Sequence, residues 1–261
     1  MQDRHQDRKQ YFLEQGKTMR KHVIPYVSQI FPINASISVL EIGCGEGGNL
    51  LPFADLGCKC VGVDIGLNRI KNAVKFFSNH KNSKNITFIA KDIYLADELE
   101  NQFDFIFLRD VIEHIHDQDK FMGYVKKFLK PGGKIFFGFP PWQNPFGGHQ
   151  QVCKSKLISK LPFFHLLPNF LYKGILKTFG ESDEKIESLL EIKETGITIE
   201  RFKRILKNHD YNIDKETFFL INPNYETKFG LKPREQSKII SSIPYFRNYC
   251  VTAFYAIVSF D

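Results

Sequence analysis

The sequence contains few cysteines, and none of them form a recognisable pair of metal ligands. Its five cysteines are an odd number, and no two have the spacing C-x-x-C. An odd number excludes complete disulfide pairing within one chain, and the lack of C-x-x-C pairs removes the usual signature of a structural zinc site. We therefore expect a reduced, cytoplasmic protein without a structural metal ion.

Long hydrophobic runs are also missing. No apolar segment reaches the roughly 18 residues that a membrane-spanning helix needs, and residues 1–10 are almost wholly polar. A secretory signal peptide would have an apolar centre there, so we expect neither a signal peptide nor a transmembrane segment. The length of 261 residues and the apolar fraction of 43% suit one large globular α/β domain, with room for an insertion.

Arginine-dense arms and alternating basic and aromatic repeats are lacking, although the formal net charge is +7. The lysines are instead scattered over several segments: residues 71–91, 126–134, 154–177 and 203–215. This distribution favours a mildly basic, solvated surface over a groove for nucleic acid. Binding to RNA remains open as the less favoured alternative.

One glycine-rich turn is the most informative feature present. The apolar run that ends at Ile42 leads into Gly43, Gly45 and Gly48, and an apolar segment of helical character follows. A strand, a glycine turn and a helix in this order let the backbone approach a nucleotide-like ligand closely. Because these glycines also satisfy G-x-G-x-x-G, the turn alone is compatible with a dinucleotide.

Strands and helices alternate after this turn, which predicts a doubly wound, mostly parallel α/β sheet. The expected parallel strands are residues 38–42, 59–64, 86–90, 103–108 and 134–139. A helix capped by Thr198 and two antiparallel strands, residues 211–221 and 249–260, should complete a seven-stranded sheet.

Four regions follow from this pattern. Residues 1–35 should form one or two helices, interrupted at Pro25, that cover the edge of the ligand site, and residues 36–140 should form the binding core. Residues 141–196 break the alternation and should form a helical insertion. Its apolar stretch from Leu157 to Pro168 is interpreted as packed helices, as a lid over an apolar acceptor site or, least favoured, as a lipid contact. Residues 197–261 return to the sheet.

Two carboxylates lie at the ends of neighbouring strands. Asp64 ends the second strand at the spacing from Gly43 that is typical of a ribose-binding acid, and Asp92 closes the third strand in the same way. Ligands of open α/β sheets bind outside the carboxyl ends of the strands. We therefore expect Gly43, Asp64, Asp92 and the Arg109-Asp110 pair to meet at one crevice.

Taken together, these motifs resemble those of class I S-adenosylmethionine-dependent methyltransferases, of the methyltransferase type 11/12 kind. The resemblance covers residues 36–140 and includes Asp110-Val111-Ile112-Glu113-His114, where isoleucine replaces the leucine of an "LEH" segment. It implies a Rossmann-like fold, S-adenosylmethionine as cofactor and ten cofactor-binding residues. These are Glu41, Gly43, Cys44, Gly45, Asp64, Ile65, Asp92, Ile93, Arg109 and His114.

The resemblance also implies individual roles. Glu41 would arrange the methionine end, Asp64 would bind the ribose, Ile65 would pack on the adenine, and Asp92 with Ile93 would recognise the adenine ring. Arg109 departs from the small or apolar residue expected beside the sulfonium, so we expect its backbone to face the ligand.

His149 is the candidate catalytic residue. It follows the fifth strand in a loop loosened by Gly147 and Gly148, where the family builds its acceptor pocket, and a histidine can act there as a general base. A structural histidine is the alternative. A metal site formed by His114, His116, Asp110 and Asp117 is an alternative, but the sequence favours a role for Glu113-His114 in ordering the loop after the fourth strand, and no metal.

The predicted function is methyl transfer to a small or lipid-like molecule. The alternatives are an RNA methyltransferase and, less favoured, a nucleotide-dependent oxidoreductase or a non-catalytic module that binds the cofactor. DNA base methylation is disfavoured because Arg109-Asp110-Val111-Ile112 stands where an Asn-Pro-Pro-Tyr type of motif would be.

Overall fold

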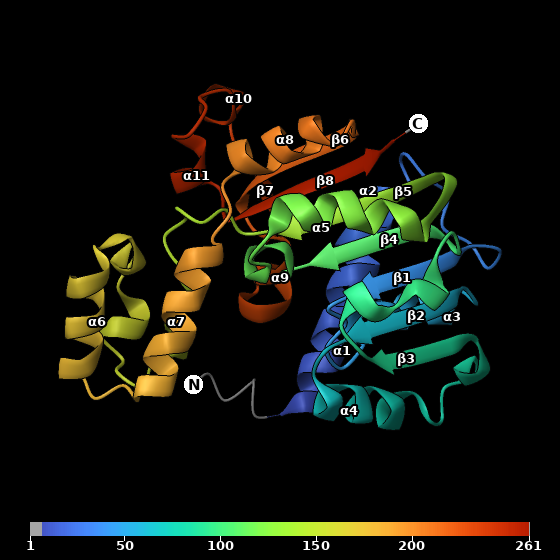
Figure 1. Cartoon of the computed structure of the whole chain (residues 1–261), viewed down its shortest axis with the longest axis horizontal. Coiled ribbons are helices and arrows are strands. Elements are labelled where there is room, and N and C mark those ends of the chain that lie inside the picture. Colours follow the sequence, from blue (N-terminus) through green and yellow to red (C-terminus); the bar gives the residue numbers. More distant parts are fainter. Residues whose placement is uncertain (1–6, 261) are drawn as a thin grey trace.

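The computed structural model describes residues 7–260, arranged around one eight-stranded sheet (Figure 1). The strand order is β3-β2-β1-β4-β5-β8-β6-β7. The strands are β1 (Ser38–Ile42), β2 (Lys59–Asp64), β3 (Ile86–Ala90), β4 (Phe103–Arg109), β5 (Leu129–Phe139), β6 (Asn212–Ile221), β7 (Arg234–Glu235) and β8 (Ala253–Ser259). The first five pair in parallel, which confirms the predicted doubly wound core.

Continuous apolar strands let the sheet bury both of its faces. Successive side chains of a strand point to opposite faces, and β4 shows this directly. Phe105 and Phe107 belong to the core cluster on one face, whereas Ile106 and Leu108 belong to the cluster on the other. Burial on both faces explains why these strands are apolar throughout rather than alternating.

Eleven α-helices of the described chain surround the sheet or extend from it. They are α1 (Arg8–Thr18), α2 (Ile24–Val27), α3 (Leu51–Asp55), α4 (Leu67–Phe77), α5 (Gln118–Val125), α6 (Asn169–Thr178), α7 (Asp183–Thr195), α8 (Ile199–Asn208), α9 (Asn224–Phe229), α10 (Lys238–Ser241) and α11 (Arg247–Cys250). Apolar residues of α5 and α8 join one core cluster, and those of α1, α2 and α3 join the other. Thr198 caps α8 as predicted, since its hydroxyl accepts from Arg201 N. No described helix is long and apolar enough to cross a membrane.

The N-terminal helical segment differs from its prediction at Pro25. The chain stays helical past this proline, because a π-helical turn (Met19–Val23) immediately precedes it and joins α1 to α2. Proline lacks the N–H of a regular helix and crowds the preceding turn, so a wider turn there relieves both conflicts. Residues 1–6 of the predicted N-terminal region lie outside the described part of the chain.

The C-terminal strands run antiparallel, as predicted, but the sheet has eight strands rather than seven. β8 lies between β5 and β6 and pairs antiparallel with both. The additional strand, β7, has only two residues and pairs with the outer edge of β6. Such a short strand has no alternating pattern to read in a sequence. The expected helix after β3 is likewise replaced by two 3-10 turns, Ile93–Leu95 and Asp97–Leu99.

Residues 141–196 form the helical insertion, with a small core of their own. Its buried residues are Cys153, Ile158, Phe164, Tyr172, Leu176, Ile186 and Leu189. Figure 1 shows α6 and α7 beyond the carboxyl ends of the parallel strands. The insertion therefore stands on the side of the molecule where ligands of such sheets bind.

Glu200, in the first turn of α8, anchors the segment that leads to β8. Its carboxylate accepts hydrogen bonds from Tyr245 N at 2.9 Å, from Arg247 Nε at 2.9 Å and from the side-chain amide of Asn248. Burial alone would raise the pKa of Glu200, but these donors and the positive charge of Arg247 outweigh it and lower the pKa. The charged carboxylate is therefore the form that stabilises the fold.

Replacing Glu200 with glutamine should lower the free energy of unfolding at pH 7 by about 1–3 kcal/mol, the usual loss for hydrogen bonds to a charged group. Because folding lowers the pKa of Glu200, its contribution is present above the unfolded pKa, roughly 4.3, and disappears as the pH falls through the folded value. Urea unfolding at pH 7 and at about pH 3 measures the difference. An undiminished gap between parent and variant at the lower pH would contradict this assignment; Glu187→Gln, on the exposed face of α7, is the control.

Candidate active site

A cavity of about 250 Å³ lies at the carboxyl ends of β1 and β4. The glycine turn after β1 and the end of β4 form one side, and three residues of α1 form another. Its lining residues are Arg8, Tyr11, Gln15, Gly43, Cys44, Gly45, Glu46, Asn49, Arg69, Arg109 and Asp110. The structure thus brings the predicted glycine turn and the Arg109-Asp110 pair to one crevice, with α1 along its edge. Asp64 and Asp92, which were expected at the same crevice, are not among the residues that line it.

The glycine turn presents bare main chain to this cavity. Gly45 has a φ of +53°, and a Cβ built on it would meet nothing within 4 Å. Gly43, by contrast, has a φ of +71°, and its Cβ would lie 2.6 Å from Cγ2 of Val111. Gly43 is therefore required by packing and backbone conformation, whereas Gly45 leaves open space for a ligand to approach the backbone.

Asp64 joins the two turns that follow β1 and β2. Its buried carboxylate accepts hydrogen bonds from Gly45 N at 2.9 Å and Gly66 N at 2.7 Å, and Arg69 Nη1 lies 3.5 Å away. A carboxylate offers about four lone-pair positions, so Asp64 retains acceptor capacity beyond these two bonds. The backbone N–H of Lys91 donates to Asp64 O at 3.2 Å, which brings the end of β3 beside it.

The other residues expected near the adenosine differ in whether their side chains are exposed and can contact a ligand. Ile65 is 78% exposed, which is unusual for an apolar side chain at the end of a buried strand. Asp92 is exposed and caps the following 3-10 turn through Tyr94 N. Ile93, however, is only 8% exposed and packs into the core, so only its backbone is left to meet a ligand.

A series of buried hydrogen bonds holds Arg109 beside the cavity. Arg109 Nη1 donates to Asn49 Oδ1 at 2.8 Å, and Asn49 Nδ2 donates to Glu41 Oε1 at 2.7 Å. Burial raises the pKa of Glu41 well above its usual value, while the Asn49 bond opposes the shift. Arg109 is among the residues that line the cavity, and its guanidinium is held by the bond to Asn49. Sequence spacing did not single out Asn49, because a helical asparagine beside a glycine turn carries no signal of its own.

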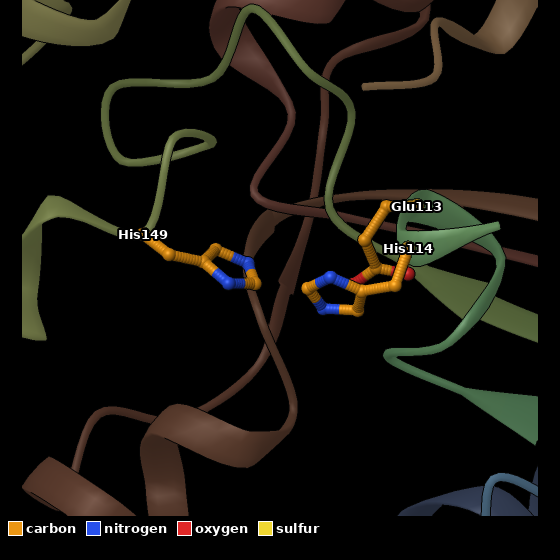
Figure 2. A group of neighbouring side chains, drawn as sticks. All are labelled: Glu113, His114 and His149. Carbon is orange, nitrogen blue, oxygen red and sulfur yellow. The ribbon is translucent and has the colours of Figure 1, made fainter. Parts of the chain in front are cut away.

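A second group of polar side chains combines the loops after β4 and β5. Donor atoms of Glu113, His114 and His149 all lie within 4.8 Å of one another, and Figure 2 shows the two imidazole rings facing each other. Burial, assisted by the neighbouring His114, lowers the pKa of His149 to about 4, so its imidazole is neutral at physiological pH. Lys228 of α9 adds to this lowering, which places α9 at the border of the site.

The other histidine and acid considered with His114 are engaged elsewhere. His116 Nε2 lies 3.0 Å from Glu191 Oε1, at the surface. The Asp117 side chain caps α5 by accepting from Lys120 N at 3.0 Å. Trp142 of the insertion packs edge-on against His165, with ring centroids 4.5 Å apart.

A family model described as a methyltransferase domain matches residues 15–149, more than half of the chain. The chain belongs to the methyltransferase domain family. This confirms the predicted class, S-adenosylmethionine-dependent methyltransferase, and the matched residues include both the glycine turn and Asp64.

Curated relatives are similar to part of the chain. Phosphoethanolamine N-methyltransferase 2 of Caenorhabditis elegans is 34% identical over 99 residues, which is 38% of this chain and 22% of that protein. The mitochondrial ubiquinone biosynthesis O-methyltransferase of Dictyostelium discoideum is 32% identical over 109 residues, 38% of this chain and 34% of its own length. The chain thus spans about a fifth to a third of the length of these relatives.

Solved structures share the fold over nearly the whole chain. A magnesium protoporphyrin IX methyltransferase from Synechocystis PCC 6803 with bound SAH gives a TM-score of 0.55 at 13% identity, over 98% of this chain and 88% of that one. A geranyl diphosphate methyltransferase in complex with SAM gives 0.58 at 11% identity, over 93% and 84%. At such identities the likeness concerns the fold, and it confirms the Rossmann-like α/β class that the sequence predicted.

Gly45→Ala should weaken binding of S-adenosylhomocysteine by more than tenfold, because the added methyl group fills the open space beside the turn. The matched control is Gly132→Ala. Gly132 also has a positive φ, +76°, and open space around it, but it lies outside the cavity lining. Both variants should lose a similar ~1–2 kcal/mol of stability from the left-handed backbone. Calorimetric titration measures the affinity, and equal affinities for the two variants would contradict the assigned role of Gly45.

Proposed function

We propose that this protein transfers a methyl group from S-adenosylmethionine to a small or lipid-like molecule. The observation that carries the proposal is the open main chain at Gly45, held directly beside the buried carboxylate of Asp64. Within a methyltransferase-family core, this arrangement suits a nucleoside ribose against bare backbone. S-adenosylmethionine supplies an activated methyl group on a cationic sulfur, so the chain needs no nucleophile of its own.

The residues of the cavity and of the strand ends beside it divide between the two ends of the cofactor. Asp64 would accept the ribose hydroxyls, and the exposed Ile65 would pack on the adenine, with Asp92 at its far edge. A carboxylate at the ribose also disfavours a 2′-phosphate, which argues against a phosphorylated dinucleotide.

At the other end of the cavity, Arg8 and Arg109 are both lining residues, and Arg8 Nη1 lies 3.4 Å from Oε1 of Glu46, which lines the cavity too. Guanidinium is the side chain that best matches a carboxylate, with two parallel hydrogen bonds. We therefore assign the methionine carboxylate of the cofactor to this end. Glu41 acts indirectly, because it orients Arg109 through Asn49.

The acceptor would lie between the cavity and the insertion, next to His149. Its neutral imidazole has one lone pair, which can either take a proton from the acceptor or bind a cation. Holding the acceptor in line with the methyl group accounts for most of the catalysis expected here, since positioning can supply roughly 7–11 kcal/mol. The relatives' names, which concern phosphoethanolamine and ubiquinone biosynthesis, supply the first acceptors to try.

The alternative functions receive less support. A nicotinamide-dependent oxidoreductase shares the glycine fingerprint but not the methyltransferase family match of residues 15–149. RNA methylation would require a basic surface at the acceptor side, and binding that falls steeply with salt.

Asp64→Ala should lower the affinity for S-adenosylmethionine by roughly 10- to 100-fold, because hydrogen bonds to a charged group contribute about 1.5–3 kcal/mol. Calorimetric titration of the purified protein measures this directly. Asp183→Asn, an exposed acid at the start of α7, is the control and should bind like the parent. No measurable binding to the parent protein would end the proposal itself.

His149→Ala should leave S-adenosylmethionine affinity within about threefold of the parent, below 1.4 kcal/mol, since His149 lies in the loop after β5, where we place the acceptor. Methyl transfer should fall by about 100-fold or more, since a general acid or base contributes at least about 100-fold. The readout is S-adenosylhomocysteine release with phosphoethanolamine and with a catechol as acceptors. His116→Ala is the matched control, because His116 is an exposed histidine two residues after His114. Turnover that survives in His149→Ala with each accepted substrate would show that the role is misassigned.

A further inference from the structure

We propose that Glu113, His114 and His149 bind a divalent transition-metal ion of the zinc type at the acceptor side of the cofactor cavity. The ion would hold an oxygen atom of the methyl acceptor, so the substrate class is one with an ionisable hydroxyl or a phosphate oxygen. Binding of the methyl acceptor to the ion rests on the proposed function, whereas the metal site itself does not.

Three side chains that can each offer a metal-ligand atom, one carboxylate and two imidazoles, lie close together. Glu113 and His114 come from the 3-10 turn after β4 (Ile112–His114), and His149 comes from the loop after β5. Their donor atoms lie within 4.8 Å of one another. Ligands bound to one ion at about 2.1 Å lie at most about 4.2 Å apart, so small side-chain rotations close the group around an ion. In Figure 2 the two rings point toward each other with the carboxylate of Glu113 behind them.

Glu113 supplies an independent reason to expect a cation. Its side chain is 4% exposed, and neither carboxylate oxygen has a hydrogen-bond partner in the described structure. A buried carboxylate without a partner is strongly unfavourable. An ion bound between Glu113 and the two imidazoles would satisfy this requirement.

The charges around the group also favour a cation. Asp110, which lines the cavity, interacts electrostatically with all three proposed ligands. Glu191 adds negative charge near His114, while Arg69 opposes it there. At His149 the opposing positive charge is Lys228 of α9. Two carboxylates, Glu113 and Asp110, therefore stand closest to the proposed ion.

The loop that carries His149 is fixed in a conformation that aims the ring. His149 has a φ of +55°, in the left-handed region that most residues avoid, and its backbone N–H donates to Phe146 O at 3.1 Å. The next residue, Gln150, donates its side-chain amide to Pro145 O at 3.2 Å and Leu161 O at 3.0 Å. Strained backbone conformations persist where the surroundings enforce them and are common at ligand-binding positions.

The ligand set selects the kind of ion. Two histidines and one glutamate form the protein half of known catalytic zinc sites, which keep a remaining position open for water or substrate. Imidazole suits zinc and its neighbours, whereas Mg²⁺ prefers oxygen ligands. A neutral imidazole has one lone pair. A nitrogen of His149 that binds the ion is therefore not free to take a proton from the methyl acceptor. The ion itself lowers the pKa of an acceptor hydroxyl bound to it, so that hydroxyl can lose its proton to water.

The test is titration of Zn²⁺ into the EDTA-treated full chain, in competition with a chromophoric chelator and without cofactor. One equivalent should bind to the parent. Glu113→Gln and His149→Gln should each weaken binding by more than the roughly 10- to 100-fold that loss of a ligand's supporting hydrogen bond causes. His116→Gln, which changes a neighbouring exposed histidine, should bind Zn²⁺ like the parent. Zn²⁺ at about 100 times its dissociation constant should raise the Tm of the parent by roughly 5 °C or more, and Mg²⁺ should not.

A second measurement needs no variant. Co²⁺ added to the parent protein should give the visible absorption of a site with nitrogen ligands, and Zn²⁺ should abolish it. Failure to bind one equivalent of Zn²⁺, equal affinity in parent and Glu113→Gln, or a featureless Co²⁺ spectrum would each overturn the metal site. S-adenosylhomocysteine titration in EDTA separates the two proposals, because cofactor binding at Asp64 and Gly45 does not involve the three ligands.

Discussion

A single buried carboxylate organises the binding edge of this protein. Asp64 ends β2 and accepts hydrogen bonds from the backbone of Gly45, after β1, and of Gly66, before α4. It thereby fixes the distance between two loops that a parallel sheet places side by side but does not itself connect. The open backbone at Gly45 depends on this hydrogen bond, because glycine residues that no hydrogen bond holds adopt many backbone conformations. The cavity of about 250 Å³ is the space that remains beside the anchored turn.

The site has two halves with different electrostatic characters. The half beside the glycine turn contains two guanidiniums, Arg8 and Arg109, with the second held by Asn49 and Glu41. The half beside the insertion contains Glu113 and two histidines, with Asp110 between the halves. Anionic groups are therefore favoured at the first half and cationic groups at the second. A methyl donor that ends in a carboxylate, and a metal ion that binds an acceptor oxygen, are placed accordingly in our proposals.

The accuracy of the sequence-based predictions followed the strength of each local signal. β2 and β3 have the predicted bounds, because each is a short apolar run closed by polar residues. Pro25 misled the prediction, since a π-helical turn accommodates it without ending the helix. β7 was missed because two residues on an edge carry no period. Arg109 was assigned through its backbone, and nothing in the sequence indicated that Asn49 would hold its guanidinium.

The sequence by itself determined the fold class, the glycine turn and the anchoring acid, because these depend on residues close together in the chain. The spacing of Gly43, Gly45 and Asp64 already describes strands that end at one edge. Only the tertiary structure brought His149 beside Glu113 and His114, since the two loops are about 35 residues apart and meet only when β4 and β5 pair. Contacts of this kind depend on how loops pack above a sheet, and no periodicity in the chain encodes that packing.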